Sequence, residues 1–407
     1  MTNTQPATGA PTTAPPATRP VNLPFLEMPP VDYGPEEAAM VAYRQRGTRR
    51  ALALDNRGPL LVDDAGRVDQ AILDAYDRHG FYVFEGVLAD DELDDIEADV
   101  ARLIDRMPVH IEATVDRLGR PALGTGLNGR NLSWVRPLSD PLGGTSASHG
   151  RHPAKMNEPA PPADAPEHVV QLILGSLQFS EACLRVYGHP DLLAVAEAVN
   201  GPDFTPFNEA LWIKHPRLGG SVAWHQDGWT HWDSPELDGR THGFNFMAQL
   251  YGCDAENGLW VVPGSHQGGR HDIAAMVAAT GSDRLPAAVP VVCGPGDVAI
   301  TNRQCIHGSF ANTSDRPRIT VNFGFHRRRS VLDVESGGIH NPVTVYDADR
   351  ISRRSEAIMY AIDARAQRFP AERRYRYAPF AGREDEFRYG PGVLDRLADY
   401  NLGDLGI

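Results

Sequence analysis

The chain has 407 residues, of which 42% are hydrophobic, and a formal net charge of −14 at pH 7. This length accommodates one large domain with insertions or two ordinary domains, and we favour one. The acidic balance, without a long stripe of Lys and Arg, argues against nucleic acid as a partner. No apolar run approaches the roughly 20 residues of a membrane helix, so we expect no membrane partner.

The N-terminal residues are rich in Thr, Ala and Pro and lack the basic start and apolar core of a secretory signal. We expect residues 1–30 to form a disordered tail and residues 31–407 to form a single domain. Cysteine pairs at metal-binding or disulfide-framework spacing are absent from the sequence, which favours reduced thiols and a cytoplasmic protein. The cysteines are Cys183, Cys253, Cys293 and Cys305.

Helix and strand signals alternate in the first third of the chain. Apolar residues at helical spacing predict helices over residues 35–46 and 69–78, and a third helix that Asp90 caps. Between the last two, Gly80 ends the helix and residues 81–84 form a strand. Further helices are expected at 168–177, 180–187 and 191–199.

Residues 107–165 contain several Gly and Pro residues and no sustained period, yet they include aromatic and basic side chains. A long irregular connection inside a compact domain is usually a functional lid or a disordered segment. We interpret this segment as a candidate lid, in which Trp134 and Arg136 are candidate substrate contacts. The alternative is a solvated insertion.

Short apolar runs separated by Gly- and Pro-containing turns follow from residue 204 to residue 328. This pattern is typical of a β-sandwich or barrel. Residues 340–407 then become helical, with helices expected at 347–368 and 393–400, and either pack around the barrel or join a second subunit, so a homo-oligomer is one expectation. The expected strands are 211–214, 222–227, 244–251, 259–262, 290–293, 298–301 and 318–325.

Three residues within this region have the chemistry of a metal site. His225 and Asp227 are two positions apart on an extended segment, so their side chains point to the same face. His307 follows a turn and a short apolar run and is the third candidate ligand. Two histidines and one carboxylate are typical of non-haem Fe(II) oxygenases, which keep three coordination positions open.

The last strand of the region, from Arg318 to residue 325, alternates strictly. Its apolar residues share one face, whereas Arg318, Thr320 and Asn322 share the other. Inside a barrel with an internal active site, the polar face can point inward. An arginine there can bind a carboxylate through two parallel hydrogen bonds.

The order of these motifs resembles the phytanoyl-CoA dioxygenase family over roughly residues 67–328. The resemblance implies a mainly β fold with flanking helices, whose core over residues 204–328 is a double-stranded β-helix, also called a jelly roll, of the cupin-like kind. It also implies an oxygenase that uses Fe(II), 2-oxoglutarate and O2. The motifs are His225-x-Asp227, Pro263-Gly264-Ser265-His266, Gly296-Asp297, His307-Gly308-Ser309 and the segment from Asn312 to Arg318.

The resemblance assigns roles to individual residues. The metal ligands fall on His225, Asp227 and His307, and the arginine that binds 2-oxoglutarate, eleven positions after the second histidine, falls on Arg318. Ser309 is a candidate contact of the same carboxylate, although a turn hydroxyl is the alternative.

Five further residues are candidates for the pocket. Lys214 and Gln249, on the strands before and after the ligand strand, are candidates to line the cosubstrate site, and the alternatives are exposed or core side chains. Three residues after Asp227 would lie at the barrel mouth and form a substrate wall, although hydrophobic packing is nearly as good an interpretation. These are Trp229, His231 and Trp232.

The implied function is that of a dioxygenase that hydroxylates an unactivated C–H bond of a specialised small molecule, of natural-product or amino-acid type, and releases succinate and CO2. Related halogenases have a small residue in place of the carboxylate ligand, so Asp227 favours hydroxylation. Two alternatives remain: a cupin-like metal enzyme that does not use 2-oxoglutarate, and a non-catalytic jelly-roll binding protein.

Overall fold

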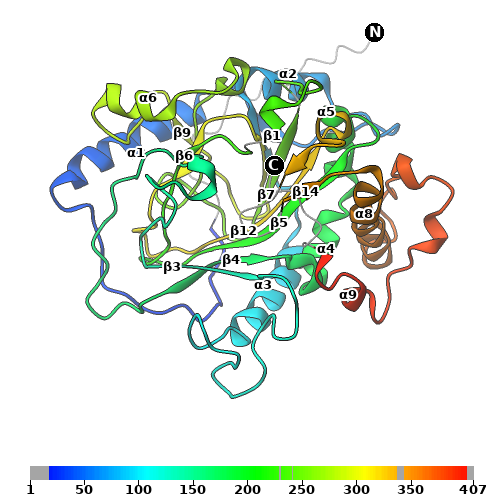
Figure 1. The fold of residues 1–407 in the computed structure, drawn as a ribbon, viewed down its shortest axis with the longest axis horizontal. Helices are drawn as coiled ribbons and strands as arrows, with labels where there is room; N and C mark the ends of the chain where they lie inside the picture. Colours follow the sequence, from blue (N-terminus) through cyan, green and yellow to red (C-terminus); the bar gives the residue numbers. More distant parts are fainter. Residues whose placement is uncertain (1–17, 229–230, 241, 337–342, 401–407) are drawn as a thin grey trace, which may run out of the picture.

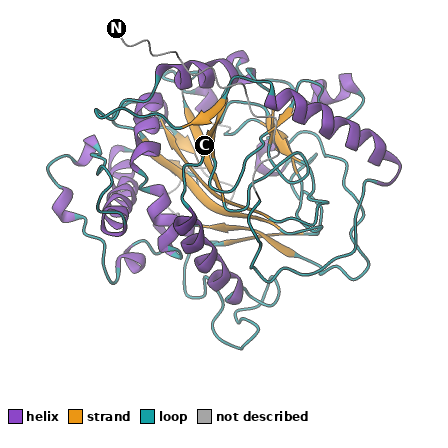
Figure 2. Cartoon of the chain, turned by 180° about the vertical axis from the view of Figure 1, so that it is seen from behind, coloured by secondary structure: helices purple, strands orange, loops and turns teal. Residues whose placement is uncertain are grey.

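A computed structural model describes residues 18–228, 231–240, 242–336 and 343–400. Two β-sheets form the centre of the molecule, and helices surround them (Figures 1 and 2). The larger sheet has eight strands. In spatial order they are β1 (Arg57–Pro59), β2 (Phe81–Glu85), β10 (Val298–Asn302), β7 (Gly243–Gln249), β12 (Arg318–His326), β5 (Thr205–Lys214), β4 (Val169–Leu174) and β3 (Leu132–Val135).

The smaller sheet has four antiparallel strands, and β6 is one of its edges. A separate two-stranded ribbon, β13 (Glu335–Ser336) and β14 (Thr344–Val345), lies near the C-terminal helices. The strands of the smaller sheet are β6 (Val222–His225), β11 (His307–Ser309), β8 (Trp260–Val261) and β9 (Val289–Pro290).

The alternation along β12 explains how the larger sheet has one apolar and one polar face. Ile319, Val321, Phe323 and Phe325 are buried in the main hydrophobic core, where helices cover the sheet. The opposite face is directed at the smaller sheet. The Lys214 ammonium on β5 donates a hydrogen bond to the Ser309 hydroxyl on β11 (2.8 Å), which joins the two sheets across a polar interior. This confirms the expected jelly roll with an inward-facing polar surface.

Helices cover the outer faces of both sheets, and none in the described part of the chain is long and apolar enough to cross a membrane. Helices α4 and α8 lie on the opposite side of the molecule from α1 and α6 (Figure 1). The helices are α1 (Glu37–Leu52), α2 (Gln70–His79), α3 (Asp90–Asp105), α4 (Glu181–Tyr187), α5 (Pro190–Asn200), α6 (Ile273–Thr280), α7 (Arg328–Val331), α8 (Ala348–Arg368) and α9 (Val393–Arg396).

Helix α1 packs closely against the smaller sheet because it has a glycine at the contact. A Cβ atom on Gly47 would lie 2.6 Å from the Trp260 ring, so only glycine fits there. One turn earlier, Tyr43 stacks on the same ring, with 4.5 Å between the ring centroids. The helix that we expected over residues 35–46 is observed as α1, which continues to Leu52. Its contacts with Trp260 hold it against β8.

The predicted helix over residues 168–177 was wrong, because this segment contains strand β4. Its β-branched residues Val169, Val170 and Ile173 suit a strand, and β4 lies between β5 and β3 in the sheet. Both neighbouring strands supply hydrogen-bonding partners. Helical spacing over so short an apolar run could not distinguish the two structures.

The ordered part of the chain begins before residue 31. The Arg19 guanidinium lies 3.2 Å from the Glu97 carboxylate on α3, and the Asn22 amide donates to the same carboxylate (3.1 Å). Leu23 is buried in the main core. The tail expected over residues 1–30 thus includes residues that contact the domain, and residues 1–17 lie outside the described residues. Helix α3 begins at Asp90, so the residue at its N-cap is Ala89 rather than Asp90.

The irregular segment 107–165 contains strand β3 and a short 3-10 helix, Ala147–Gly150. We call residues 138–158 the strap, because they run along the edge of the smaller sheet. The Ala223 N–H on β6 donates to Asp140 Oδ2 (2.7 Å), and the Asp140 N–H donates to Glu158 Oε1 (2.6 Å). The Asn157 N–H donates to Asp283 Oδ2 (2.7 Å). The strap thereby covers an edge strand that would otherwise expose unpaired backbone groups.

Candidate metal centre

Three side chains form the metal-binding cluster within the described residues. The ligand atoms of His225, Asp227 and His307 all lie within 4.8 Å of one another. Asp227 Oδ1 is 3.5 Å from His225 Nε2 and 4.0 Å from His307 Nε2. Donor atoms that share one ion at about 2 Å are roughly 3 to 4 Å apart, so the cluster can hold one metal ion with little adjustment.

Strand pairing brings the ligands together. His225 on β6 is directly opposite His307 on β11, and their ring centroids are 4.1 Å apart. Strand β6 ends at His225, two residues before the end that we expected. Asp227 lies just beyond it, where its N–H donates to the Arg303 carbonyl oxygen (2.9 Å).

Both histidines present the correct nitrogen to a metal. The His225 Nδ1 is 2.8 Å from the Ala223 carbonyl oxygen, and the His307 Nδ1 is 2.9 Å from the Cys305 carbonyl oxygen. Because a carbonyl only accepts, each Nδ1 carries the proton and each Nε2 offers a lone pair. Burial and the neighbouring His225 lower the pKa of His307 to about 4, so its ring is neutral at pH 7. This donor set fits Fe(II).

Asp227 is held by two residues that the sequence analysis missed. Its Oδ2 accepts hydrogen bonds from Asn245 Nδ2 (3.1 Å) and Arg303 Nε (3.3 Å), so Oδ1 is left for a metal. Burial disfavours the charged carboxylate, but opposing influences, the positive charge of Arg303 foremost, outweigh it and hold the pKa of Asp227 well below its usual value. The Arg303 guanidinium is also fixed against the Phe207 ring, 3.5 Å from its centroid.

A pair of buried cations lies in the same interior. Arg318 on β12 is directly opposite Lys214 on β5. Lys214 Nζ donates to Ser309 Oγ (2.8 Å) and to the Phe310 carbonyl oxygen (2.6 Å). Arg318 donates to the Asn257 carbonyl oxygen (3.1 Å), whereas its enclosed Nε has no hydrogen-bond partner.

Neither cation pairs with a carboxylate among the residues that the structure describes. Burial and the nearby Arg318 lower the pKa of Lys214 well below its usual value. Burial also lowers the pKa of Arg318. Buried cations without a counter-ion are unfavourable, so an anionic ligand beside this pair would be stabilised and would in turn favour the charged form of Lys214. A carboxylate of 2-oxoglutarate fits.

Gln249 shares the inner face with this pair. It lies opposite Thr320 in the sheet, and its Oε1 accepts a hydrogen bond from the Thr320 hydroxyl (2.9 Å). Because Thr320 is two positions after Arg318, both side chains line the same side of β12.

The expected substrate contacts lie in different places. Trp134 is on β3, an edge strand of the larger sheet, and packs against the main core. Arg136 is exposed beyond that strand. Trp232 is partly buried in a 3-10 helix, whereas Trp229 and the side chain of His231 lie outside the described residues. Instead, the strap places His152 beside the triad, with its ring centroid 4.3 Å from that of His225.

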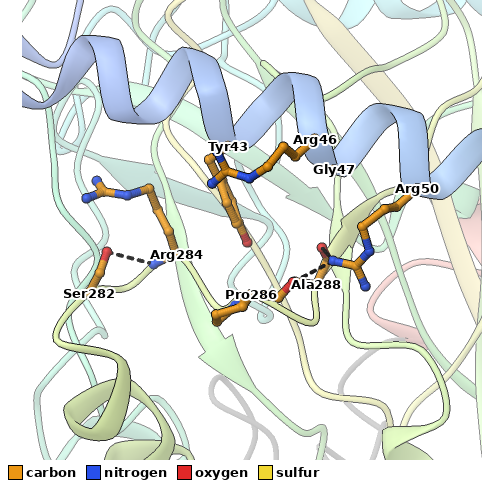
Figure 3. Close-up of a pocket in the computed structure, with 8 residues that line it drawn as sticks. All are labelled: Tyr43, Arg46, Gly47, Arg50, Ser282, Arg284, Pro286 and Ala288. Carbon is orange, nitrogen blue, oxygen red and sulfur yellow. Dashed lines mark hydrogen bonds between the residues drawn. The ribbon is translucent and has the colours of Figure 1, made fainter.

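A surface pocket of about 410 Å³ lies apart from this centre, between α1 and the loop before β9 (Figure 3). Arg50 on α1 donates to the Ala288 carbonyl oxygen (3.3 Å) across it. No residue of the triad or of the cation pair lines it, so the pocket belongs to the contact that holds α1 rather than to the metal centre. Its lining residues are Tyr43, Arg46, Gly47, Arg50, Ser282, Arg284, Pro286 and Ala288.

The chain was compared with known proteins. The sequence profile of the family described as Phytanoyl-CoA dioxygenase (PhyH) matches residues 76–320. L-proline trans-4-hydroxylase from Streptomyces griseoviridis is 25% identical over 215 residues, which are 45% of this chain and 79% of that protein.

Two solved structures have lower similarity. EvdMO1 is 23% identical with a TM-score of 0.42, and the match covers 62% of this chain and 48% of that chain. EctD from S. alaskensis, solved with 2-oxoglutarate and 5-hydroxyectoine, is 19% identical with a TM-score of 0.44, and the match covers 66% of this chain and 79% of that chain.

The profile match spans more than half of the chain and includes all three triad residues and Arg318. The sequence motifs, the metal-binding cluster and the buried cation pair agree with it. The enzyme is a non-haem iron, 2-oxoglutarate-dependent hydroxylase, and the chain belongs to the phytanoyl-CoA dioxygenase family.

Proposed function

We propose that this enzyme hydroxylates an unactivated C–H bond of a specialised small molecule, of natural-product or amino-acid type, and releases succinate and CO2. The observation that carries the proposal is the combination of a His-Asp-His cluster with a buried Lys–Arg pair inside one barrel. The similarity to an L-proline hydroxylase supports a small polar substrate.

Two separate groups of residues inside the barrel would bind the metal and the cosubstrate. His225, Asp227 and His307 would hold Fe(II), and Lys214 and Arg318 would hold the far carboxylate of 2-oxoglutarate. Together with O2, the bound iron and 2-oxoglutarate supply the oxidant that replaces a C–H hydrogen with a hydroxyl group. The protein orients these components and excludes water from them, and the strap encloses the metal centre on the β6 side.

Two other functions fit these observations less well. A cupin-like enzyme that does not use 2-oxoglutarate would have no need for two buried cations without a carboxylate partner. A binding protein without catalysis would have no need for two histidines whose free nitrogens converge on one carboxylate oxygen.

The first experiment is an anaerobic titration of the metal-free protein with Fe(II) and then with 2-oxoglutarate. We expect the weak visible absorption of the iron–2-oxoglutarate chelate in the wild type and its loss at the same 2-oxoglutarate concentration in Arg318→Met. Iron binding without this absorption would favour the cupin-like alternative, and failure to bind iron would favour the binding protein.

The substrate class is tested by succinate release. A panel of L-amino acids, including L-proline, and small polar natural-product precursors is compared with branched acyl-CoA thioesters. We expect turnover with at least one small polar compound. Much faster turnover of the acyl-CoA thioesters would contradict the proposed substrate class.

A further inference from the structure

We propose that Arg151 and His152 form a subsite beside the metal centre that binds a carboxylate of the substrate. The substrate would therefore be a small carboxylic acid, held by this group while a nearby C–H bond is oxidised. This inference rests on the proposed function, because it names the substrate class of the same site.

The position of these two residues is fixed by the strap. Asp140 holds the strap to β6 through the Ala223 N–H, and the Gly144 N–H donates to the His152 carbonyl oxygen (2.9 Å). A Cβ atom on Gly143 would lie 3.2 Å from the Ala223 Cβ, so the strap is in close contact with the ligand strand. The strap thus brings residues from a distant part of the sequence to the edge of the triad.

His152 lies against the metal ligands without being one of them. It is 2% exposed, and its ring is tilted by 39° to that of His225. The metal-binding cluster in the described residues consists of His225, Asp227 and His307 and does not include it. Its Nδ1 is enclosed and has no hydrogen-bond partner within the described structure. Buried polar atoms normally have a hydrogen-bond partner, so this ring nitrogen beside the triad is a candidate to bind a ligand.

Arg151 supplies the charge. Its Nε is enclosed without a hydrogen-bond partner, and its guanidinium forms no ion pair with any residue that the structure describes. It is close enough to Asp227 for their charges to interact. However, Asp227 Oδ2 already accepts from Asn245 and Arg303, and its Oδ1 faces the two metal-binding histidines.

An anion from outside the chain is therefore needed to neutralise Arg151. Of the two carboxylates of 2-oxoglutarate, the far one is provided for by Lys214 and Arg318, and the other would be held by the metal. We therefore assign the anion that Arg151 binds to the substrate. The guanidinium of Arg151 matches the two oxygens of a carboxylate, and His152 provides a neighbouring hydrogen-bonding group.

The test measures binding in a protein that does not turn over. The protein is loaded with Mn(II) and N-oxalylglycine and titrated calorimetrically with L-proline, acetate and benzoate, each compared with its own amide. We expect at least one acid to bind about 10- to 100-fold more tightly than its amide, as one charge-assisted hydrogen-bonded pair provides. Arg151→Met should remove this preference, and Arg151→Lys should restore part of it.

The matched control is Arg130→Met. Arg130 is an exposed arginine of the same insertion, whose Nε donates to the Leu132 carbonyl oxygen (3.3 Å), and its replacement should retain the preference for acids. Mn(II) binding and the melting temperature of each variant show whether it is folded.

Either of two results would overturn the inference: equal or undetectable binding of all acids and amides by the wild type, or an acid preference that survives in folded Arg151→Met. Because no turnover is required, this outcome is independent of the succinate panel. The panel can fail while the carboxylate site is demonstrated, and the reverse is equally observable.

Discussion

Replacement of Lys214 by methionine is expected to weaken the binding of 2-oxoglutarate and to leave Fe(II) binding nearly unchanged. The chain contains two lysines, and their surroundings are opposite: Lys155 is exposed and Lys214 is completely buried. Two of the three N–H bonds of Lys214 are directed at Ser309 and Phe310, which leaves one for a ligand. Methionine has a similar length and fills the same space without the charge.

The size of the effect follows from this one remaining hydrogen bond. A hydrogen bond to a charged group contributes about 1.5 to 3 kcal/mol. We therefore expect the dissociation constant of 2-oxoglutarate to rise by about 10- to 150-fold. Since Arg318 remains in place opposite residue 214, binding should be weakened rather than abolished.

The assay is an anaerobic titration of the Fe(II)-loaded protein with 2-oxoglutarate, followed by visible absorption or calorimetry. Lys155→Met is the matched control, because the Lys155 ammonium lies at the surface, 3.1 Å from the Glu158 carboxylate. Wild-type affinity for 2-oxoglutarate in Lys214→Met would refute the reasoning, as would an equal loss in Lys155→Met.

Three further changes test other parts of the structure. Asp227→Ala should abolish hydroxylation because it removes a metal ligand, and full turnover would remove this residue from the ligand set. Arg303→Met should weaken Fe(II) or Co(II) binding by about 10- to 100-fold, since one of the two donors to Asp227 is lost; an unchanged metal titration would contradict this. Burial raises the pKa of Glu209 from 4.5 to about 7. The protonated side chain therefore adds up to about 3 kcal/mol to the free energy of unfolding below pH 4.5, and this contribution is lost as the pH rises through 7. Glu209→Gln should lack this loss, and identical pH profiles of urea unfolding for both proteins would refute the assignment.

Local sequence patterns predicted the residues that form the metal-binding cluster. The alternation from Arg318 onward correctly separates the core-facing side of β12 from the side that faces the interior. The spacing of His225 and Asp227 places both on one side of a nearly extended segment, and the helix expected at 347–368 is observed as α8 (Ala348–Arg368). In each case the determining interactions lie within a few residues, or one side of the element is clearly apolar.

Other features depend on contacts between distant segments, which single-sequence patterns do not contain. Strand β4 was misassigned because its hydrogen-bonding partners, β5 and β3, come from other parts of the chain. Asn245 and Arg303 were missed for the same reason. Asn245 contacts Asp227 from strand β7, and Arg303 contacts it from just beyond the end of β10. No spacing rule connects these positions to the ligand motif.

The residues that we propose for the substrate side of the site could not be predicted from the sequence. Trp134 and Arg136 were chosen for their chemistry. However, Trp134 lies in β3 at the edge of the larger sheet, and Arg136 comes directly after this strand. Arg151 and His152 belong to the same insertion, and the strap, which Asp140 joins to the edge of β6, places His152 beside the triad. The metal-binding cluster is positioned by strand register. The proposed carboxylate subsite is instead positioned by the contacts of the strap with β6 and with Asp283. Insertions that bind the β6 edge differently would therefore bring different side chains to an unchanged metal centre, which allows substrate choice to vary while the chemistry is retained.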